Sequence, residues 1–382
     1  MKREKSAVFA SAAGISTGIS KRLRKSARVA MGEVLKAKKG ERVLIITNPN
    51  RDVELISMAL YDASLARGAE PTLIFQPPKT QFDFAEDAVI HALRAEPEII
   101  LSISHHKLGK DRFALKRPYE HGGKTYGHVF NYLVETKKAR SFWSPSVTVD
   151  MFERAVPINY KRLKANCKKL KSILDRAAEV HVKTRAGTDL VIGVRGRKAR
   201  TDDGDFSRPG AGGNVPAGEV FISPELGTGE GTIVFDGCIS SKGGVIIIKK
   251  PIVATVKNNM VTGLEGGREA RELKATLTAA KKTTREFAKK GLLSKKAVPG
   301  YLKNIYNLGE LGIGLNENAK IVGKMLEDEK VFRTCHIAIG ANYDRDAEAL
   351  NHLDGLVQRP TIEVRDAKGR PAVIMRNGNI IV

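Results

Sequence analysis

The chain has 382 residues, of which 42% are hydrophobic and 28% are charged, so it can build a sizeable core and is not globally disordered. No stretch reaches about 18 uncharged apolar residues, the length that a transmembrane helix needs, so we expect no membrane contact. The formal net charge of +23 concerns partners and solubility rather than the fold.

The three cysteines, Cys167, Cys238 and Cys335, are too few and too scattered for a disulfide framework or a CxxC zinc site. The N-terminal stretch 7–15 is short and rich in Ala, Ser and Gly, which does not suit a signal peptide. We therefore expect a protein of the reducing cytoplasm.

Basic residues gather in particular stretches of the chain. Residues 1–40 hold 11 Lys or Arg and two acids, and we assign residues 1–35 to a basic N-terminal arm. Residues 281–303 hold eight Lys or Arg and one acid. Because aromatic residues make up only 6% of the chain and are not interleaved with these stretches, we expect solvated basic faces with a loose attraction to nucleic acid.

The first third of the chain alternates strand and helix patterns. Apolar and β-branched runs at 42–47, 71–75 and 99–104 predict strands, and amphipathic spacing at 53–67 and 82–95 predicts helices. This order is typical of a parallel sheet covered by helices, which we assign to an N-terminal α/β domain at 36–175. No GxGxxG motif follows the first strand, so a nucleotide site there is unsupported.

The pattern then becomes that of antiparallel sheet. Runs at 180–184 and 190–194 flank a turn and predict a hairpin, and more short strands crowd the stretch 219–262. A charged helix is predicted at about 265–290, and short strands return in the tail. The predicted fold class is therefore α/β, with the parallel-sheet domain followed by an α+β domain at 176–382.

Two histidines in this second half stand in surroundings that suit metal ligands. On a strand, His352 and Asp354 would point to one face and Leu353 to the other, although a surface histidine beside an acid is the simpler alternative. His336 lies inside an apolar run, where it is either a ligand or a satisfied core residue. Its neighbour Cys335 faces the opposite way on a strand, so we interpret the thiol as packing.

Acidic residues occur in apolar frames as well. Glu219 begins an apolar strand, and Glu310 stands among glycines and aliphatic residues. A buried carboxylate needs a cation, whereas an exposed edge or loop would need none. Glu329 belongs to an acidic patch before His336, and Tyr343 follows the same run, where it could donate a proton or stabilise an oxyanion. Together these side chains suit two metal ions about 3.5–4 Å apart.

Five short stretches occur in an order that resembles the aminopeptidase T and aminopeptidase S family of metallopeptidases. They are Asn214–Pro224, Glu310–Asn316, Asp328–Lys330, His336–Gly340 and His352–Asp354. The resemblance is strong across residues 205–365 and weaker at 39–46 and 68–71. His336 and His352 lie closer together in the chain than in longer members, which implies a shortened loop over the site.

The resemblance implies a two-domain homodimer whose C-terminal domain binds two divalent ions of zinc, cobalt or magnesium. The implied metal ligands are Glu219, Glu310, Glu329, His336, His352 and Asp354. Glu310 would bridge the ions and accept the proton of the attacking water, and Tyr343 would steady the tetrahedral intermediate. The expected function is a metallo-aminopeptidase that removes residues from peptides with a free N-terminus.

Two other functions stay open. A ring-cleaving dihydroxypyridine dioxygenase resembles the same family but uses one iron ion, and His336, His352 and Asp354 would form its two-histidine, one-carboxylate site. We favour the peptidase because a site for one ion does not need both Glu219 and Glu310. The other alternative is a basic binding protein that has lost catalysis.

Overall fold

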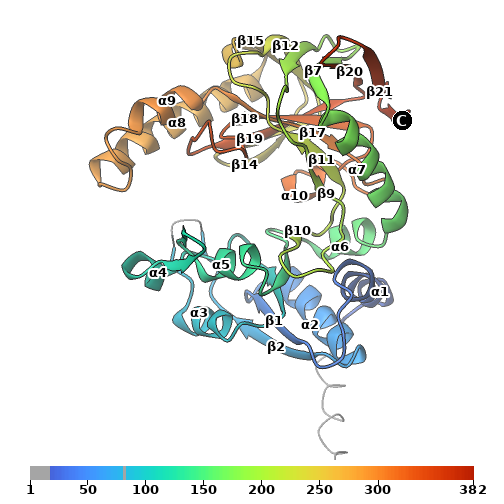
Figure 1. Ribbon diagram of the computed structural model, residues 1–382, viewed down its shortest axis with the longest axis vertical. Helices are drawn as coiled ribbons and strands as arrows, with labels where there is room; N and C mark the ends of the chain where they lie inside the picture. The colour runs from blue at the N-terminus through green and yellow to red at the C-terminus, as the bar shows by residue number, and fades with distance from the viewer. Residues whose placement is uncertain (1–17, 81–82) are drawn as a thin grey trace, which may run out of the picture. The chain divides into compact units, whose positions relative to one another are not determined.

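The computed structural model describes residues 18–80 and 83–382, which divide into two compact units (Figure 1). The first unit runs to Tyr160 and includes 204–217, and the second comprises 161–203 and 218–382. The sequence predicts a domain boundary at 175/176, whereas the first division between the two units lies at 160/161. Helix α7 (Tyr160–Leu174) therefore belongs almost wholly to the second unit. The segment 204–217 returns to the first unit, where it adds a strand to the sheet.

The expected basic arm at 1–35 is helical in most of its described part. Helix α1 (Lys21–Val29) and the π-helical turn η2 (Ala30–Val34) bury Leu23 and Met31 completely. The rest of the arm, residues 1–17, lies outside the described residues.

A five-stranded parallel sheet, in the order β10-β6-β3-β1-β2, forms the centre of the first unit. Its strands are β1 (Arg42–Thr47), β2 (Glu70–Phe75), β3 (Ile99–Ile103), β6 (Arg140–Trp143) and β10 (Gly212–Asn214). Its other helices are α2 (Arg51–Ala66), α3 (Asp87–Arg94), α4 (Arg112–Lys116), α5 (Val129–Glu135) and α6 (Val149–Ala155), and a small hairpin joins β4 (Tyr119–His121) to β5 (Lys124–Tyr126). Every residue of β3 is buried, as expected for an inner strand covered on both faces. The predicted α/β class is confirmed.

Local sequence explains where helix α2 begins and ends. The side chain of Asn50 accepts a hydrogen bond from the N–H of Asp52 at the first turn. Gly68 adopts φ +74° just after the last turn, a conformation that favours glycine. The helix predicted at 82–95 is shorter than expected, because α3 begins at Asp87.

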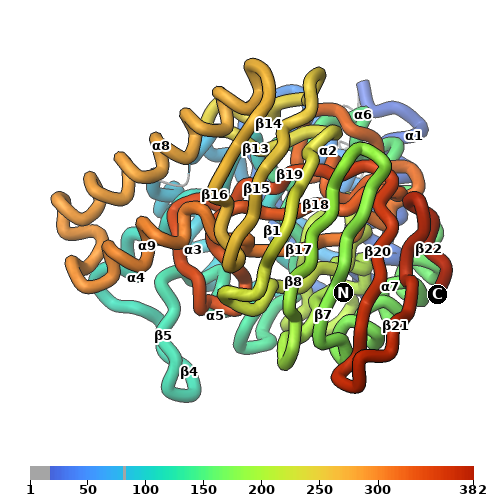
Figure 2. Tube along the Cα trace, turned by 90° about the horizontal axis from the view of Figure 1, so that it is seen from above, coloured from blue at the N-terminus to red at the C-terminus, as the bar shows by residue number. Residues whose placement is uncertain are grey.

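Two antiparallel sheets form most of the second unit, and Figure 2 shows β7, β20 and β21 of the larger one side by side. The seven-stranded sheet has the order β14-β13-β19-β18-β17-β11-β9, with β9 (Arg200–Asp202), β11 (Glu219–Ile222), β13 (Cys238–Ser241), β14 (Gly244–Ile247), β17 (Leu308–Gly314), β18 (Thr334–Gly340) and β19 (His352–Gln358). The eight-stranded sheet has the order β16-β15-β12-β8-β7-β20-β21-β22, with β7 (Ala177–Lys183), β8 (Asp189–Gly193), β12 (Glu230–Phe235), β15 (Ile252–Lys257), β16 (Met260–Glu265), β20 (Thr361–Asp366), β21 (Pro371–Arg376) and β22 (Asn379–Ile380). The sheets meet where the ring of Phe235 fills the space over Gly355.

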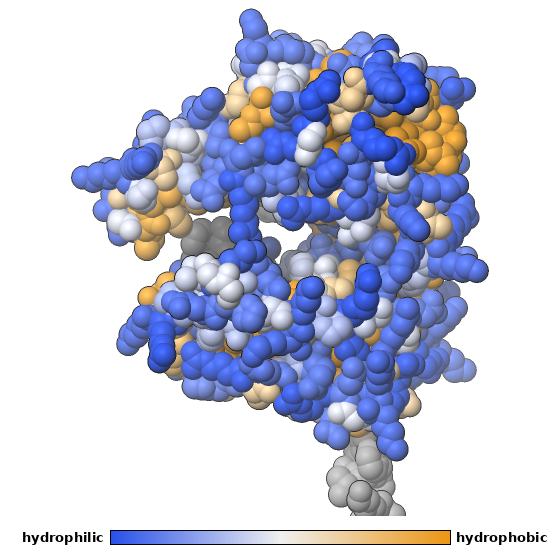
Figure 3. Space-filling model, in the orientation of Figure 1, coloured by the Kyte–Doolittle hydropathy of each residue, from blue (hydrophilic) through white to orange (hydrophobic). Residues whose placement is uncertain are grey.

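The remaining helices of the second unit are α8 (Arg268–Lys289), α9 (Val298–Asn304) and the short α10 (Met325–Asp328). The basic stretch 281–303 forms the end of α8, the turn after it and most of α9. Figure 3 shows apolar residues at the end of the pair formed by α8 and α9. In the turn between these helices, Leu292 is 67% exposed. Among the helices described, none is both long and apolar enough to cross a membrane.

Candidate metal centre

Four neighbouring strands of the seven-stranded sheet, β11, β17, β18 and β19, carry five of the six predicted metal ligands, all except Glu329. Across the sheet, Glu310 of β17 pairs with Ala338 of β18, which pairs in turn with Asp354 of β19. Directly paired residues share a face, and so do residues two apart on one strand. The ligands that this pattern places on one face are Glu219, Glu310, His336, His352 and Asp354.

Glycines on β17 make room for these side chains. Gly312 and Gly314 lie on the same face of β17 as Glu310. Of these three residues, only Glu310 has a side chain. The imidazole of His336 lies over Gly312, where an added Cβ would meet Nε2 at 2.0 Å. An added Cβ at Gly314 would meet the carbonyl oxygen of Val331 at 2.1 Å. The glycine-rich sequence of β17 therefore lets a histidine and a neighbouring chain segment approach the sheet closely.

Glu310 lies between the two histidines. Its Oε1 atom is 3.0 Å from Nε2 of His336, and its Oε2 atom is 3.5 Å from Nε2 of His352. His352 Nε2 is also 3.1 Å from Oδ1 of Asp354, and His336 Nε2 is 3.5 Å from Oε2 of Glu219. These atoms form two overlapping groups that could each hold an ion, one with Glu219, Glu310 and His336 and one with Glu310, His352 and Asp354.

Several of these atoms are buried without a hydrogen-bond partner among the residues that the structure describes. They are Oε2 of Glu219, Oε2 of Glu310, Oδ1 of Asp354 and Nδ1 of His336. Buried polar atoms left unpaired cost free energy, and carboxylate and imidazole groups are common ligands of divalent metals. The donor set therefore fits a metal ion.

A backbone carbonyl fixes the orientation of His352. Nδ1 of His352 lies 2.8 Å from the carbonyl oxygen of Ala341. Because a carbonyl only accepts hydrogen bonds, Nδ1 carries the proton and the neutral ring offers Nε2 as a ligand. The loop after β18 thus aims the histidine at Glu310 and Asp354.

Charge interactions shift the pKa values of the ligand groups in opposite directions. Burial opposes a charge on His336, but the hydrogen bond to Glu310 and the carboxylates nearby raise its pKa to about 9. Burial likewise opposes a charge on His352, and Asp354 and Glu310 raise its pKa well above the ordinary value. Burial would raise the pKa of Asp354, yet His352 and its neighbours lower it to about 2. A metal ion therefore competes with protons for both imidazoles.

A buried lysine lies beside the ligands, and its role is not evident from the sequence. Lys330 is 0% exposed, and its Nζ atom is 2.6 Å from Oε1 of Glu219, 2.6 Å from Oε1 of Glu329 and 3.4 Å from Oδ2 of Asp202. Burial opposes the charge on Lys330, but these carboxylates raise its pKa well above the ordinary range. The ammonium group is an internal cation that holds Oε1 of Glu219, while Oε2 of the same carboxylate faces His336.

The carboxylate of Glu329 is directed to this lysine. Burial and the nearby acids raise its pKa to about 8, although Lys330 opposes the shift. Glu329 belongs to neither of the two donor groups among the described residues. Its role as a metal ligand stays a prediction.

Tyr343 lies at the edge of the site, on the loop that follows β18. Its ring centroid is 5.3 Å from that of His352 and 5.1 Å from that of Phe221, and the residue is 46% exposed. The guanidinium of Arg200 donates a hydrogen bond to its carbonyl oxygen at 3.0 Å. Partial burial and the neighbouring carboxylates raise the pKa of the phenol, so the hydroxyl stays protonated. Its catalytic role also stays a prediction.

The sequence pattern predicts the packing role of Cys335 but gives no signal for Asp202. Cys335 is fully buried and faces away from His336, and burial raises the pKa of its thiol, which suits packing. Asp202 sits in a polar stretch of the sequence with no apolar frame around it. Only its pairing with Glu219 across β9 and β11 brings it to Lys330.

A family described as "NicX: 2,5-dihydroxypyridine 5,6-dioxygenase" matches residues 145–337, just over half of the chain. The chain belongs to the NicX family. The matched span contains Glu219, Glu310 and His336 and ends before His352 and Asp354.

Three individual proteins are similar to this NicX family chain, one by sequence over a short span and two by structure. A 2,5-dihydroxypyridine 5,6-dioxygenase of Pseudomonas putida is 29% identical over 108 residues, which cover 27% of this chain and 29% of the relative. The solved 2,5-dihydroxypyridine dioxygenase of Pseudomonas putida KT2440 has a TM-score of 0.68 at 16% identity and covers 94% of this chain and 97% of its own. Wild-type AmpT of Thermus thermophilus has a TM-score of 0.64 at 18% identity, with coverages of 94% and 99%.

These comparisons confirm the fold and correct part of the family prediction. The likeness to AmpT confirms the expected aminopeptidase T-like fold, and at this identity it shows the fold alone. The family matched by sequence is instead the one described as a dioxygenase, which shares that fold. The NicX family chain is thus related to enzymes, while a hydrolase class is not supported by the family match.

Proposed function

We propose that the chain is a metal-dependent dioxygenase that cleaves the ring of a dihydroxypyridine-type substrate, with one iron ion held by His336, His352 and Asp354. His352 and Asp354 form one donor group with Glu310, and His336 belongs to the other group, which shares Glu310, so binding one ion requires His336 to approach the first group. The family match supports the reaction class, and the relative with that activity shares only part of its length with this chain. Two histidines and one carboxylate are the usual ligands of non-haem iron oxygenases. The observation that carries the proposal is that Glu310 faces both imidazoles across one sheet face.

The bound iron would supply the oxygen chemistry that side chains lack. Burial would raise the pKa of Glu310, but the imidazoles of His336, at 3.0 Å, and His352, at 3.5 Å, lower it below the ordinary value. Glu310 therefore stays ionised, orients both rings and can accept a hydrogen bond from a substrate hydroxyl. Phe221 and Tyr343 add aromatic surface next to His352, which suits a planar ring.

An oxygen-uptake assay tests this proposal. The chain is loaded with Fe(II) without air and mixed with 2,5-dihydroxypyridine and oxygen, and we expect oxygen uptake together with loss of the ring absorbance. His352→Ala should lower the rate by more than about a thousandfold, because it removes a ligand. His181→Ala is the matched control, because His181 pairs with Asp189 on the other sheet of this unit. Unchanged oxygen uptake in His352→Ala would refute the proposed site.

An aminopeptidase is the second candidate, and one observation favours it. Glu219, Glu310 and His336 form a second donor group that shares Glu310 with the first, as a site for two ions requires. Hydrolysis of an aminoacyl-nitroanilide by protein loaded with zinc, cobalt or magnesium would support this candidate. Tyr343→Phe would then lower kcat while retaining the ring contacts to His352 and Phe221.

A further inference from the structure

A pocket of about 700 Å³ lies in the first unit, among the ends of helices α3 and α4, helix α5 and strand β4. Figure 1 shows these three helices grouped in one part of this unit. Arg94, the last residue of α3, and Glu96 line the pocket just before β3 begins. The volume falls within the range of about 300–1,000 Å³ that is typical of small-molecule sites. Every lining residue belongs to the first unit, so the pocket is complete within that unit.

Positive charge without acidic partners gathers in this pocket. Three of its exposed side chains are cations that form no ion pair in the described part of the chain. They are Arg94, Lys116 and Arg117. The carboxylate of Glu96 pairs with Lys138, which leaves Glu120 as the other acid among the lining residues. The pocket therefore attracts anions.

Aromatic side chains hold Arg94 in place. Its Nε atom donates a hydrogen bond to the hydroxyl of Tyr119 at 2.9 Å. Its guanidinium carbon lies 4.6 Å from the centroid of the Phe113 ring and 5.6 Å from that of Tyr119. Tyr119 in turn stacks on Tyr132, with ring centroids 5.5 Å apart. Because Nε is already engaged, the terminal N–H groups of an oriented guanidinium remain for a ligand.

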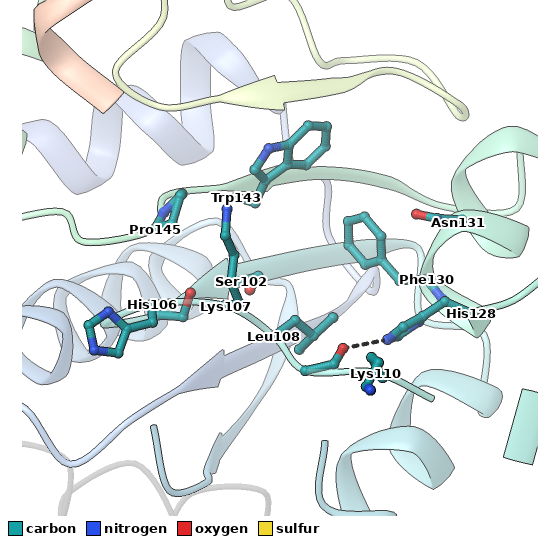
Figure 4. Close-up of a pocket in the computed structure, with 12 residues that line it drawn as sticks. Ser102, His106, Lys107, Leu108, Lys110, His128, Phe130, Asn131, Trp143 and Pro145 are labelled. Atoms are coloured by element: carbon teal, nitrogen blue, oxygen red, sulfur yellow. Dashed lines mark hydrogen bonds between the residues drawn. The ribbon is translucent and has the colours of Figure 1, made fainter. Parts of the chain in front are cut away.

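Two further side chains, Asp111 and His128, fix the helices that flank the pocket. The carboxylate of Asp111 accepts hydrogen bonds from the N–H of Phe113 in α4, at 2.9 Å, and from the N–H of Val129 in α5, at 3.1 Å. Nε2 of His128 donates to the carbonyl oxygen of Gly109 at 3.1 Å, the bond that Figure 4 marks with a dashed line. The pocket walls are thus preformed, which lowers the entropic cost of binding.

We propose that this pocket binds a phosphorylated small molecule. The phosphate oxygens accept hydrogen bonds from Arg94, Lys116 and Arg117, since the planar fork of a guanidinium matches the oxygens of a phosphate. Three cations against Glu120 suit a group with at least two negative charges. A nucleic-acid backbone would instead need an extended basic groove that follows the strand. Binding needs no metal ion and goes beyond the dioxygenase activity proposed above.

Calorimetric titration with inorganic pyrophosphate tests for this site. The full chain is stripped of metal with a chelator, desalted and titrated at about 150 mM salt, which screens weak attraction to the general positive charge. We expect one site per chain with a dissociation constant below about 1 mM. Citrate should bind more weakly, because its charges are spread over a flexible molecule that loses more conformational entropy on binding. An RNA oligomer without terminal phosphates should not displace pyrophosphate.

Arginine variants assign the binding to this pocket. Arg94→Met and Arg117→Met should each weaken pyrophosphate binding at least about tenfold, because each removes charge-assisted hydrogen bonds. The side chain of Arg117 makes no hydrogen bond among the described residues, so its variant keeps the fold even if Arg94→Met does not. Arg28→Met removes an exposed arginine of α1, in the same unit, and should leave the affinity unchanged.

Three results would each overturn the proposal. Equal pyrophosphate affinity in the wild type and in the Arg94→Met and Arg117→Met variants would place the binding elsewhere on the chain. Tighter binding of citrate than of pyrophosphate would identify a site for polycarboxylates. Displacement of pyrophosphate by the RNA oligomer would identify a nucleic-acid surface.

Discussion

Gly312 and His336 lie opposite each other on β17 and β18, and the imidazole covers the glycine so closely that a Cβ there would lie 2.0 Å from Nε2. The same strand carries Glu310 two residues earlier, on the same face. The separation between Glu310 and the His336 ring therefore depends on residue 312 having no side chain.

Gly312→Ala should push the His336 imidazole away from Glu310. We expect the free energy of unfolding to fall by about 1–3 kcal/mol, as for other overpacked sites, and the affinity for Fe(II) to fall at least about tenfold. Urea unfolding and metal titration measure these effects. Gly300→Ala is the control, because an added Cβ there meets nothing within 4 Å. Wild-type metal affinity in Gly312→Ala would show that the glycine does not set the ligand geometry.

Lys330→Met should destabilise the second unit strongly. The substitution leaves Glu219, Glu329 and Asp202 buried without their shared cation, and breaking a buried ion pair from one side costs about 3–5 kcal/mol. Chemical denaturation at neutral pH measures the loss. Lys320→Met, at an exposed lysine nearby in the sequence, should change stability by less than about 0.5 kcal/mol. Equal stabilities in the two variants would contradict the role given to Lys330.

The stability of the metal-free protein should fall as the pH rises from about 6.5 to 9. The folded pKa of His336 is about 9, above the value of about 6.5 in an unfolded chain. Its stabilising contribution is therefore complete below about pH 6.5 and is lost as the pH rises through 9. The raised pKa values of Glu329, about 8, and Asp202, about 7, act in the same direction.

Denaturation curves of chelator-treated protein across this pH range measure the effect. His336→Gln should flatten the pH dependence, since it removes the group with the highest of these three pKa values. Fe(II) affinity should rise over the same range, because the imidazoles must lose their protons to bind metal. A metal-free protein whose stability is constant or increases toward pH 9 would contradict the protonation states inferred for the cluster.

Asp354→Asn and Glu329→Gln should differ in metal binding. Asp354 belongs to a donor group with Glu310 and His352, so its loss should lower Fe(II) affinity at least about a hundredfold. Glu329 faces Lys330, so its neutral variant should change the affinity by less than about tenfold. Equilibrium competition with a coloured chelator gives both values. If both variants lose metal equally, Glu329 is a ligand as the resemblance first implied.

The sequence predicts the elements whose signals are local. The apolar run at 42–47 and the glycine after α2 identify a strand and a helix end within a few residues. His352, Leu353 and Asp354 alternate between the two faces of β19 as period-two spacing requires, with Leu353 buried. Glu310 and His336 are recognisable because polar residues inside apolar frames are unusual.

Other features depend on contacts between distant segments and have no local signal. Lys330 and Asp202 are 128 positions apart in the sequence, and only the pairing of β9 with β11 brings the acid to the lysine. The return of 204–217 to the first unit depends on β10 pairing with β6, which three residues of glycine and asparagine do not reveal. The number of bound ions also has no local signal in the sequence. It depends on the carboxylate of Glu219, whose two oxygens lie beside Lys330 and His336, residues that are far from it in the chain.

The iron content of each chain tests the central claim most directly. The wild type and the His352→Ala and Asp354→Asn variants are loaded with Fe(II) without air, desalted and measured by mass spectrometry of the metal. We predict one iron ion per wild-type chain and less than about a tenth of that in either variant. Two tightly bound ions per wild-type chain, or full iron content in the variants, would contradict a single-ion site built on His336, His352 and Asp354.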